Sequence, residues 1–108
     1  MSSLQPAVSK LTDEERNTLL QPLLKNGWNL CPDQDACYRE FDFNSFTSVM
    51  GFLTLVSFKA EKLDHHPEWT NKHTHVYMKW STHDANGLTK RDISMMNYIN
   101  SLKLDLKN

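Results

Sequence analysis

Apolar residues in the first quarter of the chain recur at helical spacing, and their context predicts a helix with defined ends. Thr12 and Glu15 form a capping box, so the helix should begin at Asp13. Pro22 should kink or shorten this helix, because proline removes a backbone donor and crowds the preceding turn. The Asn26-Gly27 pair should end it. The apolar stripe of the helix consists of Leu19, Leu20, Leu23 and Leu24.

Two later segments alternate apolar and polar residues with the period of a half-buried strand. In the segment 36–43 one face carries Cys37, Arg39, Phe41 and Phe43. In the segment 75–81 the apolar face is formed by Val76, Met78 and Trp80. Shorter strands are expected at 28–29, ahead of a turn at 32–35, and at 69–72. The chain therefore contains four predicted strands.

The longest periodic apolar segment, between the two strand pairs, predicts a second helix with Asn44 as its N-cap. Gly51 lies inside this helix, where glycine costs about 1 kcal/mol relative to alanine. We therefore expect close packing at Gly51. The apolar positions of this helix are Phe46, Val49, Met50, Leu53, Val56 and Ala60.

A second capping box, formed by Thr89 and Asp92, predicts a third helix after the Asn86-Gly87 turn. Leu88 and Ile93 are placed as its hydrophobic staple. Its apolar positions are Ile93, Met96, Ile99 and Leu102. The order αββαββα predicts an α+β fold, a four-stranded antiparallel sheet with three helices on one face. Such a small open sheet leaves edge strands, which a homodimer could pair.

The composition is that of one globular domain. The chain has 108 residues, of which 39% are hydrophobic and 23% charged, and both fractions are ordinary. We predict a flexible N-terminal tail at residues 1–10 and a single domain at residues 11–108. The net charge of -1 gives no electrostatic basis for direct binding of nucleic acid or an anionic membrane. The most apolar run, residues 49–58, is shorter than the roughly 20 residues that span a bilayer.

Two cysteines and the absence of a signal-like apolar stretch in residues 1–10 favour an intracellular protein with reduced thiols. We therefore expect a cytoplasmic protein, small enough to have a nuclear pool as well. A nucleophilic Cys/His pair is not excluded by spacing, but nothing near Cys31 or Cys37 indicates an activated thiol.

Three of the five histidines lie where the predicted regular elements end. His65 and His66 precede Pro67 at a helix-to-strand turn, where two adjacent rings can converge on one pocket. His83 follows the last strand. Such loops commonly carry functional groups. Imidazole titrates near about 6.5, so these side chains suit general acid–base catalysis. Neighbouring carboxylates that could orient the rings or raise their pKa are Glu61, Asp64 and Asp84.

Simpler interpretations of the same residues stay open. The Asp64–Pro67 segment could be a solvated turn that ends a helix. Three histidines could also hold zinc, although no HExxH-like spacing supports a metal site. His73 and His75 read as strand residues facing water, and Asp92 is explained by its cap. Trp28 and Trp69 are expected in the core or in a pocket wall.

The segment 61–69, together with Ser81-Thr82-His83, Gly87-Leu88-Thr89 and Asp92, resembles the signature of the pterin-4a-carbinolamine dehydratases. The Leu-rich first helix ending in Gly27-Trp28 is also similar to that family, and the resemblance extends over about residues 11–102. It implies the fold predicted above, and dehydration of 4a-hydroxytetrahydrobiopterin to quinonoid dihydrobiopterin during tetrahydrobiopterin recycling. It implies that no metal or organic cofactor is needed, and that the protein is a homodimer or homotetramer.

By position, the resemblance implies that the catalytic residues are His65, His66 and His83, with His66 and His83 flanking the reacting centre and His65 assisting. The implied substrate-binding residues are Glu61, Asp64, His65, His66, Ser81, Thr82 and His83. A second role is implied by animal relatives that act as a dimerisation cofactor for a homeodomain transcription factor. The chain departs from those relatives at Asp84, Ala85 and His73. The alternatives to the enzyme are therefore a non-catalytic coactivator that binds a partner helix, and a pterin-binding protein without catalysis.

Overall fold

The computed structural model describes residues 8–108 of the chain, so part of the predicted tail, residues 1–7, lies outside the described residues. The first helical stretch consists of α1 (Asp13–Glu15), a π-helical segment (Arg16–Leu20) and α2 (Gln21–Leu24). Then follow β1 (Asn29–Leu30), β2 (Cys37–Asp42), α3 (Phe46–Leu63), β3 (Glu68–Lys72), β4 (His75–Trp80), a 3₁₀ turn (His83–Ala85) and α4 (Lys90–Ser101). The predicted αββαββα order is confirmed.

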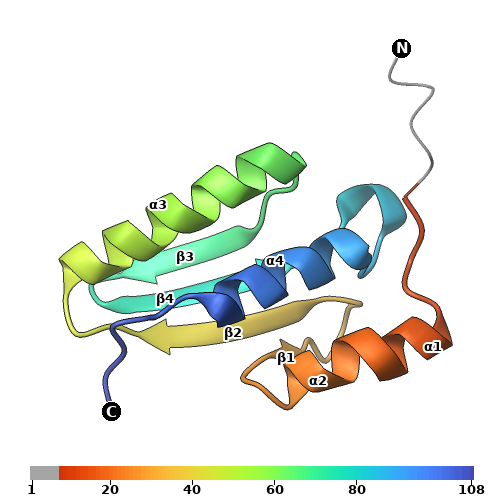
Figure 1. Cartoon of the computed structure of the whole chain (residues 1–108), viewed down its shortest axis with the longest axis horizontal. Coiled ribbons are helices and arrows are strands. Elements are labelled where there is room, and N and C mark those ends of the chain that lie inside the picture. The colour runs from red at the N-terminus through yellow and green to blue at the C-terminus, as the bar shows by residue number, and fades with distance from the viewer. Residues whose placement is uncertain (1–7) are drawn as a thin grey trace.

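The four strands form one antiparallel sheet in the order β1-β2-β4-β3. The helices lie on one side of it, with α3 and α4 side by side over the sheet and α1–α2 beside the short β1 edge (Figure 1). The predicted strand parity is confirmed, because the inward positions of β2 and β4 are almost completely buried, except for the half-buried Arg39. These core residues are Cys37, Phe41, Val76, Met78 and Trp80.

The first helical stretch has the predicted ends. Thr12 Oγ1 accepts from the Glu15 N–H, and Glu15 Oε1 accepts from the Thr12 N–H. The stretch ends at Gly27, whose φ of 105° is a conformation that residues with a Cβ avoid. Pro22 does not break the stretch. Instead, a π-helical segment precedes it, and this widened turn is a usual local form of disruption beside a missing backbone donor.

Two predictions about the second helix are wrong. Its N-cap is Ser45, whose Oγ accepts from the Ser48 N–H, and not Asn44. Asn44 instead donates from Nδ2 to Asp105 Oδ1 at 2.8 Å, which ties the C-terminal segment to the start of α3. Gly51 is not closely packed, since a Cβ added there would meet no atom within 4 Å. It lies on the solvent-facing side of α3.

The histidine-bearing loops both lie at one end of the sheet, where α3 leads into β3 and where β4 leads into α4. No helix within residues 8–108 is long and apolar enough to cross a bilayer.

Candidate functional site

The turn after α3 is shaped by Asp64, the C-cap residue of the helix. Asp64 adopts a left-handed conformation, with φ 49° and ψ 46°, which ends the helix. The next residue, His65, donates its backbone N–H to Ala60 O at 3.0 Å. The helix end therefore turns back on itself just before Pro67. Because the backbone does not continue as a regular strand here, the side chains of His65 and His66 are free to line the same cavity.

The loop after β4 is closed by backbone pairing between its two ends. The Thr82 N–H donates to Gly87 O at 2.9 Å, and the Gly87 N–H donates to Thr82 O at 3.3 Å. This bridge makes residues 83–86 a small projecting turn that carries His83 at its base. His83 is exposed, whereas Thr82 is buried. The loop therefore presents an imidazole to solvent from a fixed position.

The two loops together enclose a cavity of about 280 Å³. It brings together six of the seven side chains that the sequence predicts as a site, and Asp84 and Arg91 complete its lining. The six are Asp64, His65, His66, Ser81, Thr82 and His83. An adjoining cavity of about 270 Å³ shares four of them and extends to Gln34, Glu68, Lys79 and Asn86. The convergence of the adjacent histidines on one pocket, expected from the turn, is what the geometry shows.

His65 is held by a buried carboxylate. The residue is only 6% exposed, and its Nε2 lies 2.6 Å from Asp92 Oδ1. The other carboxylate oxygen, Oδ2, accepts from Thr82 Oγ1 at 2.8 Å and from the Thr89 N–H at 2.9 Å. With Asp92 ionised, Nε2 carries a proton that it donates, so a neutral His65 ring has its lone pair on Nδ1.

The chain matches, over residues 9–102, the family described as pterin 4 alpha carbinolamine dehydratase. It belongs to this family. A Paraburkholderia xenovorans protein named "putative pterin-4-alpha-carbinolamine dehydratase" is 44% identical over 95 residues, which are 88% of this chain and 97% of that protein. A Burkholderia pseudomallei protein of the same name is also 44% identical, over 88% of this chain and 92% of its own length.

The fold agrees with that membership. The crystal structure of a transcriptional coactivator/pterin dehydratase from Brucella melitensis is 39% identical and superposes with a TM-score of 0.79, covering 86% of this chain and 97% of that one. The predicted fold class, four antiparallel strands with three helices, is therefore also the fold of a solved pterin dehydratase.

Asp92, for which the sequence predicts a helix cap and a place in the family signature, also contacts a site histidine. Its predicted capping box with Thr89 is present. The carboxylate has two oxygens, however, and the cap uses only Oδ2. The signal in the sequence was weak, since His65 and Asp92 are 27 residues apart and only the packing of α4 beside the α3 turn joins them.

Glu61 is the one predicted site residue that does not line the cavity with His83. Its Oε1 lies 3.6 Å from His66 Nε2, with 85% of the Glu61 side chain and 61% of the His66 side chain exposed. It lines a neighbouring hollow of about 450 Å³ with Pro67 and Trp69. Trp69 is therefore in a pocket wall, one of the two places expected. Because both partners are exposed, Glu61 can contribute only a weak ion pair to His66.

A bidentate ion pair ties the first helical stretch to this end of the dehydratase fold. Arg16 Nη1 and Nη2 donate to Asp35 Oδ1 and Oδ2 at 2.9 and 2.8 Å. Asp35 Oδ2 also accepts from the Leu88 N–H at 3.1 Å, and the Asp35 carbonyl accepts from Ser81 Oγ. The Arg16 guanidinium holds the pKa of Asp35 below its usual range. The loop that carries Gln34 is thereby fixed against both ends of the 81–88 loop.

The remaining histidines and the cysteines lie away from the cavity. His75 is bound through both ring nitrogens, to Asp42 Oδ1 at 2.9 Å and Glu40 Oε1 at 2.8 Å. The strand assignment of His73 is wrong, because it sits in the β3–β4 turn with φ 56°. Burial raises the pKa of the Cys37 thiol to about 12, so it is no activated nucleophile. In residues 8–108 no three His, Cys, Asp or Glu side chains are grouped to hold a metal ion.

Proposed function

We propose that the protein catalyses the dehydration of 4a-hydroxytetrahydrobiopterin to quinonoid dihydrobiopterin. The observation that carries this proposal is the meeting of His65, His66 and His83 in one cavity, in a chain that belongs to the dehydratase family. The reaction needs a group that accepts a proton and a group that donates one, both near the same carbon atom. Imidazoles can do either at neutral pH.

The proposed reaction consists of proton transfers and the breaking of one bond. A proton leaves the ring nitrogen N5 beside the carbinolamine carbon, and the electron pair forms the C4a=N5 double bond. The C4a–O bond breaks, and the departing hydroxyl takes up a proton and leaves as water. The product is the quinonoid dihydropterin. Since every step is a proton transfer or bond cleavage within the substrate, the proposal requires neither metal nor organic cofactor.

We assign the direct proton transfers to His66 and His83, because their exposed side chains line both cavities at the site. His65 assists them. Its buried pairing with Asp92 fixes the ring, so its Nδ1 lone pair has a defined direction. Asp64, Ser81 and Thr82 line the same cavity and are proposed to bind the pterin. Glu61 is proposed to contribute to substrate binding indirectly, through its ion pair with His66.

The test is the rate of dehydration of carbinolamine made by an aromatic amino acid hydroxylase, with and without the purified protein. We expect a clear acceleration above the spontaneous reaction. His66→Ala and His83→Ala should each lower the catalysed rate by about 10²-fold or more, the usual contribution of a general acid or base. His73→Asn is the matched control, because it replaces an exposed histidine in the distant β3–β4 turn.

Three outcomes would count against the assignment. A folded protein that binds a pterin but leaves the spontaneous rate unchanged would be a binding protein and not an enzyme. Equal losses in His66→Ala and His73→Asn would remove the special role of the cavity. A rate that falls when EDTA is added, and recovers with added metal, would contradict the cofactor-free mechanism.

A second function is favoured by the solvent-facing side of α3, which carries exposed large apolar side chains. Gly51, Leu55 and Phe58 follow one another at i, i+4 and i+7, and the Phe58 side chain is 64% exposed. Large exposed apolar groups on one helix face are typical of helix–helix contacts. We propose that this face assembles the protein into a homodimer or homotetramer, and that the same face is where a transcription-factor helix would pack if the chain also acts as a coactivator.

Sedimentation velocity tests this second proposal. Phe58→Lys should shift the protein towards a smaller species, because a lysine in place of the most exposed apolar side chain of this face opposes its burial. Leu30→Lys changes an exposed leucine on the β1 edge and tests assembly through sheet edges instead. A wild-type protein that sediments as a monomer, or a Phe58→Lys variant that sediments like the wild type, would overturn the α3 assignment. We expect the dehydratase to act in the cytoplasm, with a nuclear pool where it serves as coactivator.

A further inference from the structure

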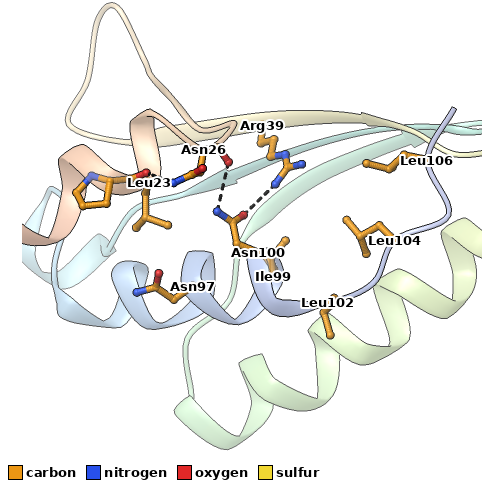
Figure 2. Close-up of a pocket in the computed structure, with 10 residues that line it drawn as sticks. Leu23, Asn26, Arg39, Asn97, Ile99, Asn100, Leu102, Leu104 and Leu106 are labelled. Carbon is orange, nitrogen blue, oxygen red and sulfur yellow. Dashed lines mark hydrogen bonds between the residues drawn. The ribbon is translucent and has the colours of Figure 1, made fainter. Parts of the chain in front are cut away.

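A separate cavity of about 480 Å³ lies at the C-terminal end of α4. It is bounded by the end of α2, by β2, by the last turn of α4 and by the C-terminal segment (Figure 2). The histidine cavity lies at the other end of α4, next to Arg91. Among the described residues the two cavities have no lining residue in common. A function for this second cavity is therefore independent of the proposed dehydration.

The only charged side chain that lines this cavity among residues 8–108 is Arg39, on β2. Its Nη1 donates to Asn100 Oδ1 at 2.9 Å, and its Cζ lies 4.7 Å from the centre of the Phe41 ring. No carboxylate of residues 8–108 forms an ion pair with Arg39, and residues 1–7 contain neither Asp nor Glu. Arg39 is thus a half-buried cation without a counter-ion in its own chain.

This arrangement leaves most of the guanidinium N–H groups without a protein partner among the described residues. Arg carries five N–H donors, and one hydrogen bond from the side chain is present in the described part of the chain. Burial lowers the pKa of Arg39, which is the direction expected when no anion offsets the loss of water. The ring of Phe41 offsets part of that cost by a cation–π contact. An anion bound in the cavity would offset the rest.

The guanidinium is also held in place before any ligand arrives. Asn100 Oδ1 accepts from Trp28 Nε1 at 2.8 Å as well as from Arg39, and Asn100 Nδ2 donates to the Asn26 carbonyl at 3.3 Å. Figure 2 shows these bonds between Arg39, Asn100 and Asn26 at one wall of the cavity. A fixed guanidinium loses little freedom on binding, so its planar fork is ready for a bidentate partner.

The other walls of the cavity are mainly apolar or neutral. Leu23 and Ile99 come from the core, while Leu104 and Leu106 come from the C-terminal segment and are partly exposed. The neutral polar side chains of the lining are Asn26, Asn97 and Asn100. A single cation with neutral surroundings matches a single negative charge better than a phosphate dianion.

We propose that the Arg39 cavity binds a small monocarboxylate with an apolar body. The carboxylate oxygens accept hydrogen bonds from the Arg39 guanidinium, and the apolar body lies against the leucines of the C-terminal segment. The ligand class follows from the chemistry of the walls, namely one fixed planar cation beside apolar surface. Binding at this cavity does not depend on the histidines.

The experiment is an NMR titration of the ¹⁵N-labelled full-length protein with 3-phenylpropionate, and separately with its neutral amide, 3-phenylpropanamide. We expect saturable shift changes at the backbone amides of Asn97, Asn100 and Leu104. The amide should bind about tenfold more weakly, because it loses the charge-assisted hydrogen bonds. Arg39→Met keeps the apolar stem and removes the charge, so it should weaken the binding of 3-phenylpropionate by about tenfold or more.

Asn97→Phe provides a second variant, which fills the cavity from an exposed position on α4 and leaves Arg39 in place. It should also abolish the shift changes, whereas His66→Ala should leave them unchanged. The proposal is overturned if the shifts are absent up to about 10 mM, a concentration that would detect even millimolar affinity. Equal affinity for the acid and the amide, or shifts confined to the histidine cavity, would overturn it too.

Discussion

Thr82 and Asp92 are joined inside the molecule by a hydrogen bond of 2.8 Å from Thr82 Oγ1 to Asp92 Oδ2. Both side chains are buried, and Thr82 Oγ1 also lies 2.7 Å from Thr89 Oγ1. The loop that carries His83 is therefore bonded to the same carboxylate that holds His65. The positions of two of the three site histidines thus depend on one aspartate, and this leads to the first prediction.

Asp92→Asn should lower the dehydration rate by about 10²-fold while the protein stays folded. The amide oxygen can still accept from Thr82 and Thr89, but its NH₂ group would face His65 Nε2. The His65 ring would then place its proton on Nδ1 and lose the acceptor it offers there. Stopped-flow kinetics measure the rate, and ¹⁵N NMR of the ring nitrogens reports the tautomer. An unchanged rate with a changed tautomer would show that His65 takes no part in catalysis.

Asp35→Asn should lower the free energy of unfolding by about 1 kcal/mol at pH 7, since the ion pair with Arg16 is bidentate but partly exposed to solvent. Because Arg16 lowers the pKa of folded Asp35, the wild-type advantage exists above the ordinary aspartate pKa, near about 3.9. It should disappear as the pH falls through the lower folded pKa. Urea unfolding of both proteins at several pH values measures this difference. A difference that stays constant down to pH values below the folded pKa would contradict it.

His75→Gln should have the opposite pH dependence. Hydrogen bonds to Asp42 and then to Glu40 raise the pKa of His75. The stabilisation is therefore complete below the ordinary histidine pKa, near about 6.5, and is lost as the pH rises through the folded value. The His75 side chain is 40% exposed, so screening limits the effect to about 0.2–1 kcal/mol. Thermal melts of the wild type and of His75→Gln at acidic and alkaline pH test this, and a difference that does not shrink at alkaline pH would contradict it.

Two glycine substitutions should change stability in opposite directions. Gly51→Ala should stabilise the monomer by about 0.5–1 kcal/mol, because the position is an open site inside α3. Gly27→Ala should destabilise it by about 1 kcal/mol or more. Its φ of 105° disfavours a side chain, and a Cβ there would lie 3.1 Å from Arg39 Cζ. Denaturant unfolding at low protein concentration checks both, and the same sign for the two variants would refute the local explanation.

The fold could be predicted because its signals are local. The capping boxes at Thr12 and Thr89, the alternation in β4 and the left-handed Gly27 each act within a few residues, and all are present in the structure. The N-cap of α3 was mispredicted for a nonlocal reason. Asn44 and Ser45 are both good capping residues, and Asp105, which engages Asn44, is 61 residues away in the chain.

The loops that carry the candidate site were predicted from the sequence, but the contacts that other elements make with them were not. The turn before Pro67 predicted that His65 and His66 line one pocket, and the family resemblance added His83, which lines the same cavity. The buried partner of His65 could not be deduced, because the cap already explained Asp92 and the packing of α4 was unknown. The alternation in β2 correctly placed Arg39 on the same face as Cys37 and Phe41. Whether a carboxylate lies near Arg39 depends on the packing of all the elements around β2, which the sequence pattern does not give.

The abrupt end of α3 at Asp64 also limits how the protein can be redesigned or can diverge. Inserting or deleting one residue within α3 would rotate everything after it by about 100° around the helix axis. The two adjacent histidines would then point away from His83, however well the altered helix packed. Changes of length are cheaper in the exposed turn around Pro32 and Asp33, which precedes β2 and carries none of the site histidines. The length of α3 therefore determines where the histidines of the candidate site lie, and engineered chimaeras of this fold should be joined outside this helix.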